Sequence, residues 1–75
     1  MKVRLPQLSE KDTSVILTLW HVKEKDYIYL GNDLFEVVTD KATFDIPSPA
    51  SGRVIKILKK EGDTILPGEV LAEIE

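Results

Sequence analysis

The chain contains 75 residues with a mass of 8.5 kDa, which is enough for one small domain. It has no cysteine and one histidine, His21, so a disulfide framework, a thiolate zinc site, a cysteine nucleophile and a two-histidine metal motif are excluded. Ten basic and thirteen acidic residues give a net charge of −3, which argues against nucleic acid and anionic membranes as partners. We therefore expect a single domain over residues 1–75 that holds no metal and catalyses no reaction by itself.

The first residues, Met1 to Pro6, contain no apolar segment of signal-peptide type, and Glu10 and Asp12 follow too early for a transit peptide. The apolar stretches along the chain are too short to span a bilayer. We expect a domain of the bacterial or archaeal cytoplasm, or of the mitochondrial matrix.

Short β-rich runs follow one another along the rest of the chain. Val, Ile and Thr supply nineteen residues and Ala three, which favours strands because β-branched side chains pack well on a pleated surface. The clearest runs cover residues 15–20, 35–39 and 53–58, separated by Gly, Pro, Asp and Asn, and no stretch keeps a helical period over ten residues. The sequence predicts an all-β fold.

The chain carries an internal repeat at an offset of 37 residues, almost half its length. Neither copy could bury an apolar face alone, so we expect two strand–turn–strand units that pack face to face as a small sandwich or flattened barrel. The alternative, recurrence through composition bias, is disfavoured because both glycines and both aspartates fall in register. Seven of the fifteen pairs between residues 23–37 and 60–74 are identical: Lys23/Lys60, Glu24/Glu61, Asp26/Asp63, Ile28/Ile65, Gly31/Gly68, Leu34/Leu71 and Glu36/Glu73.

At the join between the two copies, residues 38–42, the pattern predicts a hairpin with Asp40-Lys41 at its tip. The pair is not Asn-Gly or Asp-Gly, so a type I′ turn is not favoured. A type I-like turn suits Asp40, whose carboxylate can accept bonds from backbone amides two residues on. Lys41 then projects from the tip beside the small Ala42, and the segment 47–52, rich in Pro and Ser, redirects the chain into the next strand.

This central segment resembles the lipoyl domains of 2-oxo acid dehydrogenase complexes. That family has a flattened barrel of two four-stranded antiparallel sheets with quasi-two-fold symmetry, which agrees with the repeat found independently. The resemblance covers nearly the whole chain. It rests on residues 38–43, Ile46-Pro47-Ser48-Pro49 and Gly52 at the centre, on 5–10 at the family's opening, on 20–23 in its second strand, and on 61–65 and 68–71 in its closing segment.

The resemblance implies a modified lysine. In the family, an Asp-Lys-Ala or similar triplet occupies the tip of the central hairpin, and the lysine amine carries lipoic acid in amide linkage. Lys41 is then the attachment residue, and Asp40 and Ala42 flank it as recognition residues for the modifying and partner enzymes. Gly31 matches a family glycine in the loop before the hairpin.

The resemblance further implies a covalent carrier rather than an enzyme. A protonated lysine is a poor nucleophile at neutral pH, so a lipoate-attaching enzyme must supply an activated lipoyl group and a base. The expected partners are a thiamin-diphosphate 2-oxo acid decarboxylase, an acyltransferase core and dihydrolipoamide dehydrogenase. The lipoyl arm would carry acyl groups and reducing equivalents between them. We expect the isolated domain to be monomeric and to form part of a longer dihydrolipoamide acyltransferase chain. The residues do not indicate which 2-oxo acid is served.

Three positions depart from the family pattern. Ser9 stands where the family usually has glycine, and the segment 11–14 lacks the glycine expected ahead of the second strand. Lys25 replaces a turn glycine that the second copy keeps as Gly62. If this turn requires a positive φ, lysine costs about 1 kcal/mol there.

Three other interpretations compete with lipoylation. A biotin carrier domain shares the fold and the lysine placement, but that family resembles Met-Lys-Met at the tip, whereas this chain has Asp40-Lys41-Ala42. An unmodified structural or interaction barrel would leave Lys41 an ordinary surface residue. A nucleic-acid-binding barrel would need stacking aromatics in a basic groove, which the net charge of −3 disfavours.

None of the remaining conspicuous residues is expected to be catalytic. Trp20 is expected in the core, and His21 is expected to face solvent without the acidic and nucleophilic partners of a catalytic triad. The charged segments 23–26 and 59–61 are expected to form solvated turns. Glu36, Asp40 and Asp45 near the tip form a weak candidate docking patch.

Overall fold

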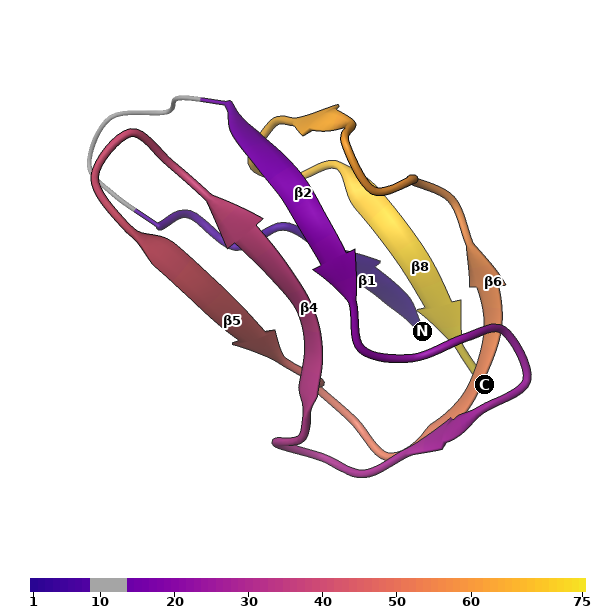
Figure 1. Ribbon diagram of the computed structural model, residues 1–75. Helices are drawn as coiled ribbons and strands as arrows, with labels where there is room; N and C mark the ends of the chain where they lie inside the picture. The colour runs from indigo at the N-terminus through magenta and orange to yellow at the C-terminus, as the bar shows by residue number, and fades with distance from the viewer. Residues whose placement is uncertain (9–13) are drawn as a thin grey trace.

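The computed structural model describes residues 1–8 and 14–75, so the departure from the family pattern at Ser9, and most of segment 11–14, lie outside the described residues. Every regular element in the described part of the chain is a β-strand (Figure 1). No helix there is long and apolar enough to cross a membrane. The strands are β1 (Lys2–Arg4), β2 (Val15–Trp20), β3 (Tyr27–Ile28), β4 (Asp33–Val38), β5 (Thr43–Pro47), β6 (Gly52–Ile57), β7 (Thr64–Ile65) and β8 (Val70–Ile74).

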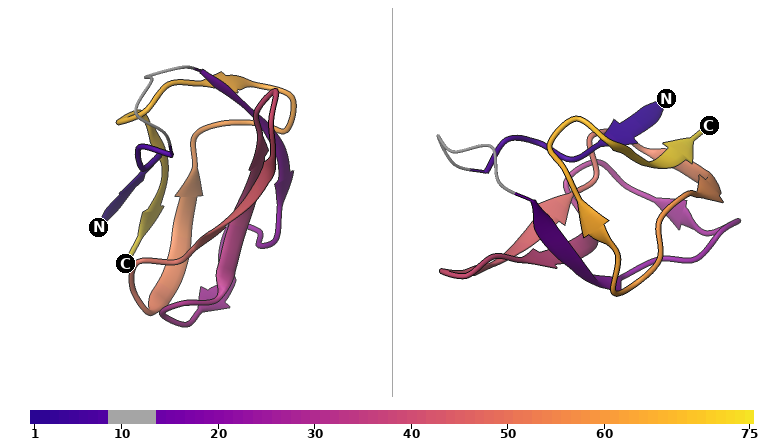
Figure 2. Two further views of the ribbon diagram at one scale, coloured as in Figure 1. Left: turned by 90° about the vertical axis from the view of Figure 1, so that its left-hand side faces the viewer. Right: turned by 90° about the horizontal axis from the view of Figure 1, so that it is seen from above.

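The strands form two four-stranded sheets, with orders β1-β8-β6-β3 and β5-β4-β2-β7, and every pairing is antiparallel. The views in Figure 2 show the two sheets facing each other across the interior. The predicted all-β fold of two four-stranded antiparallel sheets is therefore confirmed.

The two halves of the chain have the same topology. Adding 37 to the residue numbers of β2 and β3 gives the bounds of β6 and β7, and exchanging the halves converts one sheet order into the other. The irregularities repeat as well: the register shift between Leu17 and Leu19 recurs between Val54 and Lys56. Because even the bulges correspond, the repeat in the sequence reflects two copies of one backbone unit.

The copies contribute equivalent side chains to a single core. Leu34 and Leu71 are both fully buried, and Ile28 and Ile65 are also buried at matching positions. The match is not complete, because Phe35 corresponds to the small Ala72. Phe35 packs its ring against Trp20 at a centroid distance of 5.2 Å. Trp20 is only partly buried, and its indole N–H donates to the Lys59 carbonyl at 2.9 Å, so the expected core role of Trp20 holds for the ring but not for its polar edge.

The charged turns at 23–26 and 60–63 have the same internal hydrogen bonds. The Lys23 amide donates to Asp26 Oδ2 at 2.9 Å, and the Lys60 amide donates to Asp63 Oδ2 at 2.8 Å. Each turn then needs a residue with positive φ, which is Gly62 at φ 96° in the second copy and Lys25 at φ 81° in the first. The sequence-based expectation that Lys25 occupies a glycine-type position is therefore confirmed.

The same turns connect the two sheets through their glutamates. The Ile57 amide donates to Glu24 Oε2 at 2.8 Å, and the Trp20 amide donates to Glu61 Oε2 at 3.0 Å. Each carboxylate thus accepts a bond from the end of a strand in the other half of the chain. Although these turns are largely exposed, as expected, their repeated Glu and Asp residues are explained by hydrogen bonding.

Candidate functional site

The hairpin of β4 and β5 projects from one end of the sandwich. The two strands pair from Asp33↔Pro47 to Val38↔Thr43, the longest strand pairing in the described structure. Figure 1 shows the closed end of this hairpin at the upper left, with both chain termini toward the opposite end, and the views of Figure 2 agree. Along its two strands, Val37 and Ile46 are buried in the core. A side chain at the tip is therefore held on a supported but exposed turn.

The tip consists of Asp40, Lys41 and Ala42, all of which are exposed. The Thr39 amide donates to the Ala42 carbonyl at 2.8 Å and closes the turn. In the described part of the chain, Lys25 is the only residue other than glycine with a positive φ, so the tip is not a type I′ turn, as the sequence predicted. The structure therefore brings together all three residues that the sequence proposed for the tip.

The hydrogen-bonding role assigned to Asp40 belongs instead to its neighbour. Thr39 Oγ1 accepts from the amides of Lys41 at 3.2 Å and Ala42 at 3.1 Å, and it lies 3.2 Å from the Ala42 carbonyl, to which it donates. The expectation that the Asp40 carboxylate caps the turn was wrong. Both Thr and Asp can cap a turn by this geometry, and the turn begins at Thr39, one residue earlier than the sequence reasoning supposed.

The chemistry available at this tip is that of an accessible primary amine. No carboxylate of the described residues forms a salt bridge with the Lys41 ammonium group. A narrow turn with a small residue, Ala42, beside the lysine offers little steric hindrance to a large enzyme. The site therefore fits a group attached covalently through the lysine nitrogen, because the Lys41 side chain is exposed to solvent.

The two sheets differ in the charges that their strands carry, which sequence analysis missed. The charged strand residues of the sheet with the hairpin are all acidic: Asp33, Glu36 and Asp45. Those of the other sheet are mainly basic: Lys2, Arg4, Arg53 and Lys56, with Glu73 as the one acid. Strand order assembles these groups from distant segments, so only the net charge of −3 was visible beforehand.

Two of the three residues in the predicted docking patch are cross-strand neighbours. Glu36 lies directly opposite Asp45 in the β4–β5 ladder, and like charges in that arrangement are destabilising. Glu36 Oε2 accepts a hydrogen bond from Thr18 Oγ1 at 2.8 Å, which offsets part of the repulsion. Asp40 is at the tip itself, beyond the paired strands. The patch is thus a pair on the sheet and a separate residue at the turn.

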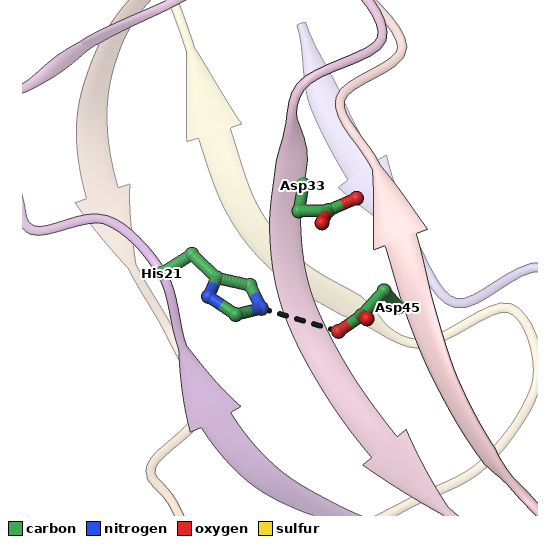
Figure 3. Close-up of side chains that lie close together, drawn as sticks. All are labelled: His21, Asp33 and Asp45. Atoms are coloured by element: carbon green, nitrogen blue, oxygen red, sulfur yellow. Dashed lines mark hydrogen bonds and ion pairs between the residues drawn. The ribbon is translucent and has the colours of Figure 1, made fainter.

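His21 has an acidic partner that the sequence did not reveal. It is exposed, as expected, but its Nε2 lies 3.2 Å from Asp45 Oδ1, with Asp33 nearby (Figure 3). The expectation that His21 lacks the partners of a catalytic triad was therefore wrong for the acidic partner, which is Asp45. The ligand atoms of the three residues all lie within 4.8 Å of one another, so these are the described residues that could hold a metal ion. All three are exposed, and a hydrogen bond between imidazole and carboxylate accounts for the approach of His21 to Asp45 without an ion.

Comparison with known protein families gives a match over almost the whole chain. The family model Biotin_lipoyl, described as "Biotin-requiring enzyme", matches residues 1–74. Among solved structures, the lipoyl domain of the 2-oxoglutarate dehydrogenase complex from Azotobacter vinelandii, determined by NMR, superposes with a TM-score of 0.79 at 27% identity, covering 99% of this chain and 94% of that one.

Curated relatives come from three kinds of complex. The dihydrolipoyllysine-residue succinyltransferase component of the 2-oxoglutarate dehydrogenase complex of Bartonella vinsonii is 34% identical over 99% of this chain and 18% of its own length. The acetyltransferase component of the Corynebacterium glutamicum pyruvate dehydrogenase complex is 39% identical over 96% of this chain and 11% of its own. The Pseudomonas aeruginosa lipoamide acyltransferase component of the branched-chain α-keto acid dehydrogenase complex is 36% identical over 97% and 17%. The chain thus spans less than a fifth of the length of these relatives.

Proposed function

Because this chain belongs to the Biotin_lipoyl family, we propose that it is a lipoyl carrier domain whose attachment residue is Lys41. The observation that carries the proposal is the position of Lys41, exposed at the tip of the β4–β5 hairpin. The names of the relatives support lipoate over biotin, since they are lipoamide acyltransferases or components named for a dihydrolipoyllysine residue.

In the proposed modification, the lysine nitrogen forms an amide with an activated lipoyl group supplied by a ligase. The nitrogen–carbon bond forms, the bond between the acyl carbon and its activating group breaks, and the amine loses its proton. The positive charge of Lys41 disappears, so the net charge changes from −3 to −4. The attached lipoyl group would supply a dithiolane for acyl and electron transfer, a chemistry that this cysteine-free chain lacks.

The contribution of the domain is presentation. The buried residues of the hairpin strands keep the turn in place, and a long arm on Lys41 raises the local concentration of its reactive end at successive active sites. The proposed partners are the lipoate-attaching enzyme, a thiamin-diphosphate 2-oxo acid decarboxylase, an acyltransferase core and dihydrolipoamide dehydrogenase. The size of the relatives supports a place for this domain within a longer acyltransferase chain.

Intact-mass measurement after co-expression with a lipoate ligase tests this function. We expect the wild-type domain to gain one lipoyl group and the Lys41→Arg variant to gain none. Lys60→Arg is the matched control, because Lys60 is also an exposed turn lysine, and this variant should gain one group. If the wild type stays unmodified, or if Lys41→Arg is still modified, the proposal is wrong.

Biotinylation is the second candidate, favoured by one observation, the description of the matching family as "Biotin-requiring enzyme". The same mass measurement after co-expression with a biotin ligase separates the two. We expect no mass gain there, because the residues beside Lys41 are Asp40 and Ala42 rather than methionines. A biotinylated product without lipoylation would replace the lipoyl proposal.

A further inference from the structure

The hydroxyl group of Thr39 uses its full hydrogen-bonding capacity inside the hairpin tip. A threonine hydroxyl has one donor and two acceptor positions. Oγ1 donates to the Ala42 carbonyl at 3.2 Å and accepts from the amides of Lys41 at 3.2 Å and Ala42 at 3.1 Å. Together with the bond from the Thr39 amide to the Ala42 carbonyl at 2.8 Å, these contacts define the Thr39 turn, residues 39–42.

Because its donor and both acceptor positions are used within the turn, the Thr39 hydroxyl differs in role from the neighbouring side chains. An enzyme that recognises the tip finds the side chains of Asp40, Lys41 and Ala42 exposed, whereas the Thr39 hydroxyl has no donor or acceptor left to offer it. Any effect of the hydroxyl on an enzyme must therefore pass through the backbone of the turn. Two of its three contacts are to the amides of Lys41 and the residue that follows it, so the direction of the lysine side chain depends directly on Thr39.

We infer that Thr39 is a positioning residue for the modification of Lys41: its hydroxyl holds the turn in the conformation that the attaching enzyme binds. The inference rests on the proposed function. The hydrogen bonds are exposed and long for their type, so water replaces them easily when the hydroxyl is absent. Loss of the hydroxyl should then leave the folded sandwich intact and release the tip into several conformations.

The expected kinetic signature follows from this loss of order. If only a fraction of the tips has the competent conformation, the apparent affinity of the enzyme for the domain is reduced to that fraction of its full value. The chemical step in the bound complex is unchanged. For the isosteric variant Thr39→Val we expect the KM for the domain to rise about three- to ten-fold, the range that corresponds to losing weak exposed hydrogen bonds, with kcat preserved. Thr39→Ser keeps the hydroxyl and should restore the wild-type KM.

The experiment measures kcat and KM of a lipoate ligase for the wild-type domain, Thr39→Val, Thr39→Ser and the control Thr43→Val. Thr43 is an exposed threonine on the adjoining strand, and within the described residues its side chain makes no hydrogen bond. Two further readouts are independent of the ligase. Amide hydrogen exchange at Lys41 and Ala42 should accelerate in Thr39→Val, and acylation of Lys41 by a small N-hydroxysuccinimide ester should keep its wild-type rate.

The outcomes distinguish the inference from the proposed function. If the ligase does not modify the wild type, the proposed function fails, and unchanged amide exchange in Thr39→Val would also remove the role of Thr39 in the turn. If the wild type is modified and Thr39→Val has an unchanged KM, the inference is overturned. It is also overturned if Thr39→Ser is as impaired as Thr39→Val, or if Thr43→Val gives the same rise in KM. Should Thr39→Val unfold, the comparison of Thr39→Ala with Thr39→Ser decides by the same criteria.

Discussion

Replacing Lys25 by glycine is expected to stabilise this domain. Lys25 has a φ of 81°, in the left-handed region, and the equivalent residue of the second copy is Gly62 at φ 96°. The backbone around both residues is the same, since the Lys25 amide donates to the Val54 carbonyl and the Gly62 amide donates to that of Leu17. The turn therefore demands a positive φ in both halves, and only the second half meets it with a residue that adopts it freely.

Two opposing contributions set the size of the stabilisation expected for Lys25→Gly. A left-handed conformation costs an L-residue with a β-carbon about 1–2 kcal/mol, which glycine avoids. Glycine in turn raises the conformational entropy of the unfolded chain, which removes about 0.4–1 kcal/mol of the gain. We expect Lys25→Gly to increase the free energy of unfolding by a net amount of about 1 kcal/mol, equivalent to about 4–8 °C in Tm for a domain of this size.

The reciprocal substitution checks the same reasoning from the other side. A β-carbon built at Gly62 meets no atom within 4 Å, so the cost of Gly62→Ala comes from the backbone alone. We expect a loss of about 1 kcal/mol for Gly62→Ala. Because the two substitutions lie in separate turns, the double variant Lys25→Gly/Gly62→Ala should return close to wild-type stability.

Urea unfolding followed by circular dichroism measures these differences, with thermal unfolding as a second observable. Lys25→Ala is the control for charge, because it removes the ammonium group and keeps the β-carbon, and it should bring no stabilisation. The reasoning is refuted if Lys25→Gly is no more stable than Lys25→Ala, or if Gly62→Ala leaves the urea midpoint unchanged.

Three further substitutions test the packing and the contacts between the halves by the same unfolding measurements. Gly52→Ala would place a β-carbon against the Glu75 carbonyl oxygen and 2.7 Å from Ile74 Cγ2, so we expect a loss of about 1–3 kcal/mol, and an unchanged midpoint would show that the chain end yields freely. Glu61→Ala removes the acceptor of the Trp20 amide and should cost about 1 kcal/mol, whereas Glu61→Gln keeps an acceptor and should cost less; equal losses would contradict the hydrogen-bonding role. Leu34→Ala empties a fully buried position and should cost about 2–5 kcal/mol, and a loss below 1 kcal/mol would mean that the core collapses around the cavity.

The fold and the position of the hairpin tip could be predicted from the sequence because both depend on local sequence patterns. Short β-branched runs between turn residues indicate strands, and the offset of 37 shows that a strand–turn–strand unit occurs twice. The alignment of Lys25 with Gly62 in the repeat even predicted a strained backbone position. The exposure of Lys41 followed in the same way, because a polar pair between two apolar runs must lie at the end of a hairpin.

What the sequence alone did not reveal depends on distances between residues far apart in the chain or on competition between neighbours. His21 contacts Asp45 because β2 and β5 lie on either side of β4, and no local sequence pattern specifies the order of the strands. The acidic and basic sheets arise in the same way. At the tip, Thr39 and Asp40 could both have capped the turn, and only the hydrogen-bonding geometry decided for Thr39. Local patterning thus determined the strands, the repeat and the exposed lysine, while tertiary packing determined each partner, since a hydrogen bond or ion pair forms only where the complete fold brings two groups within about 3 Å.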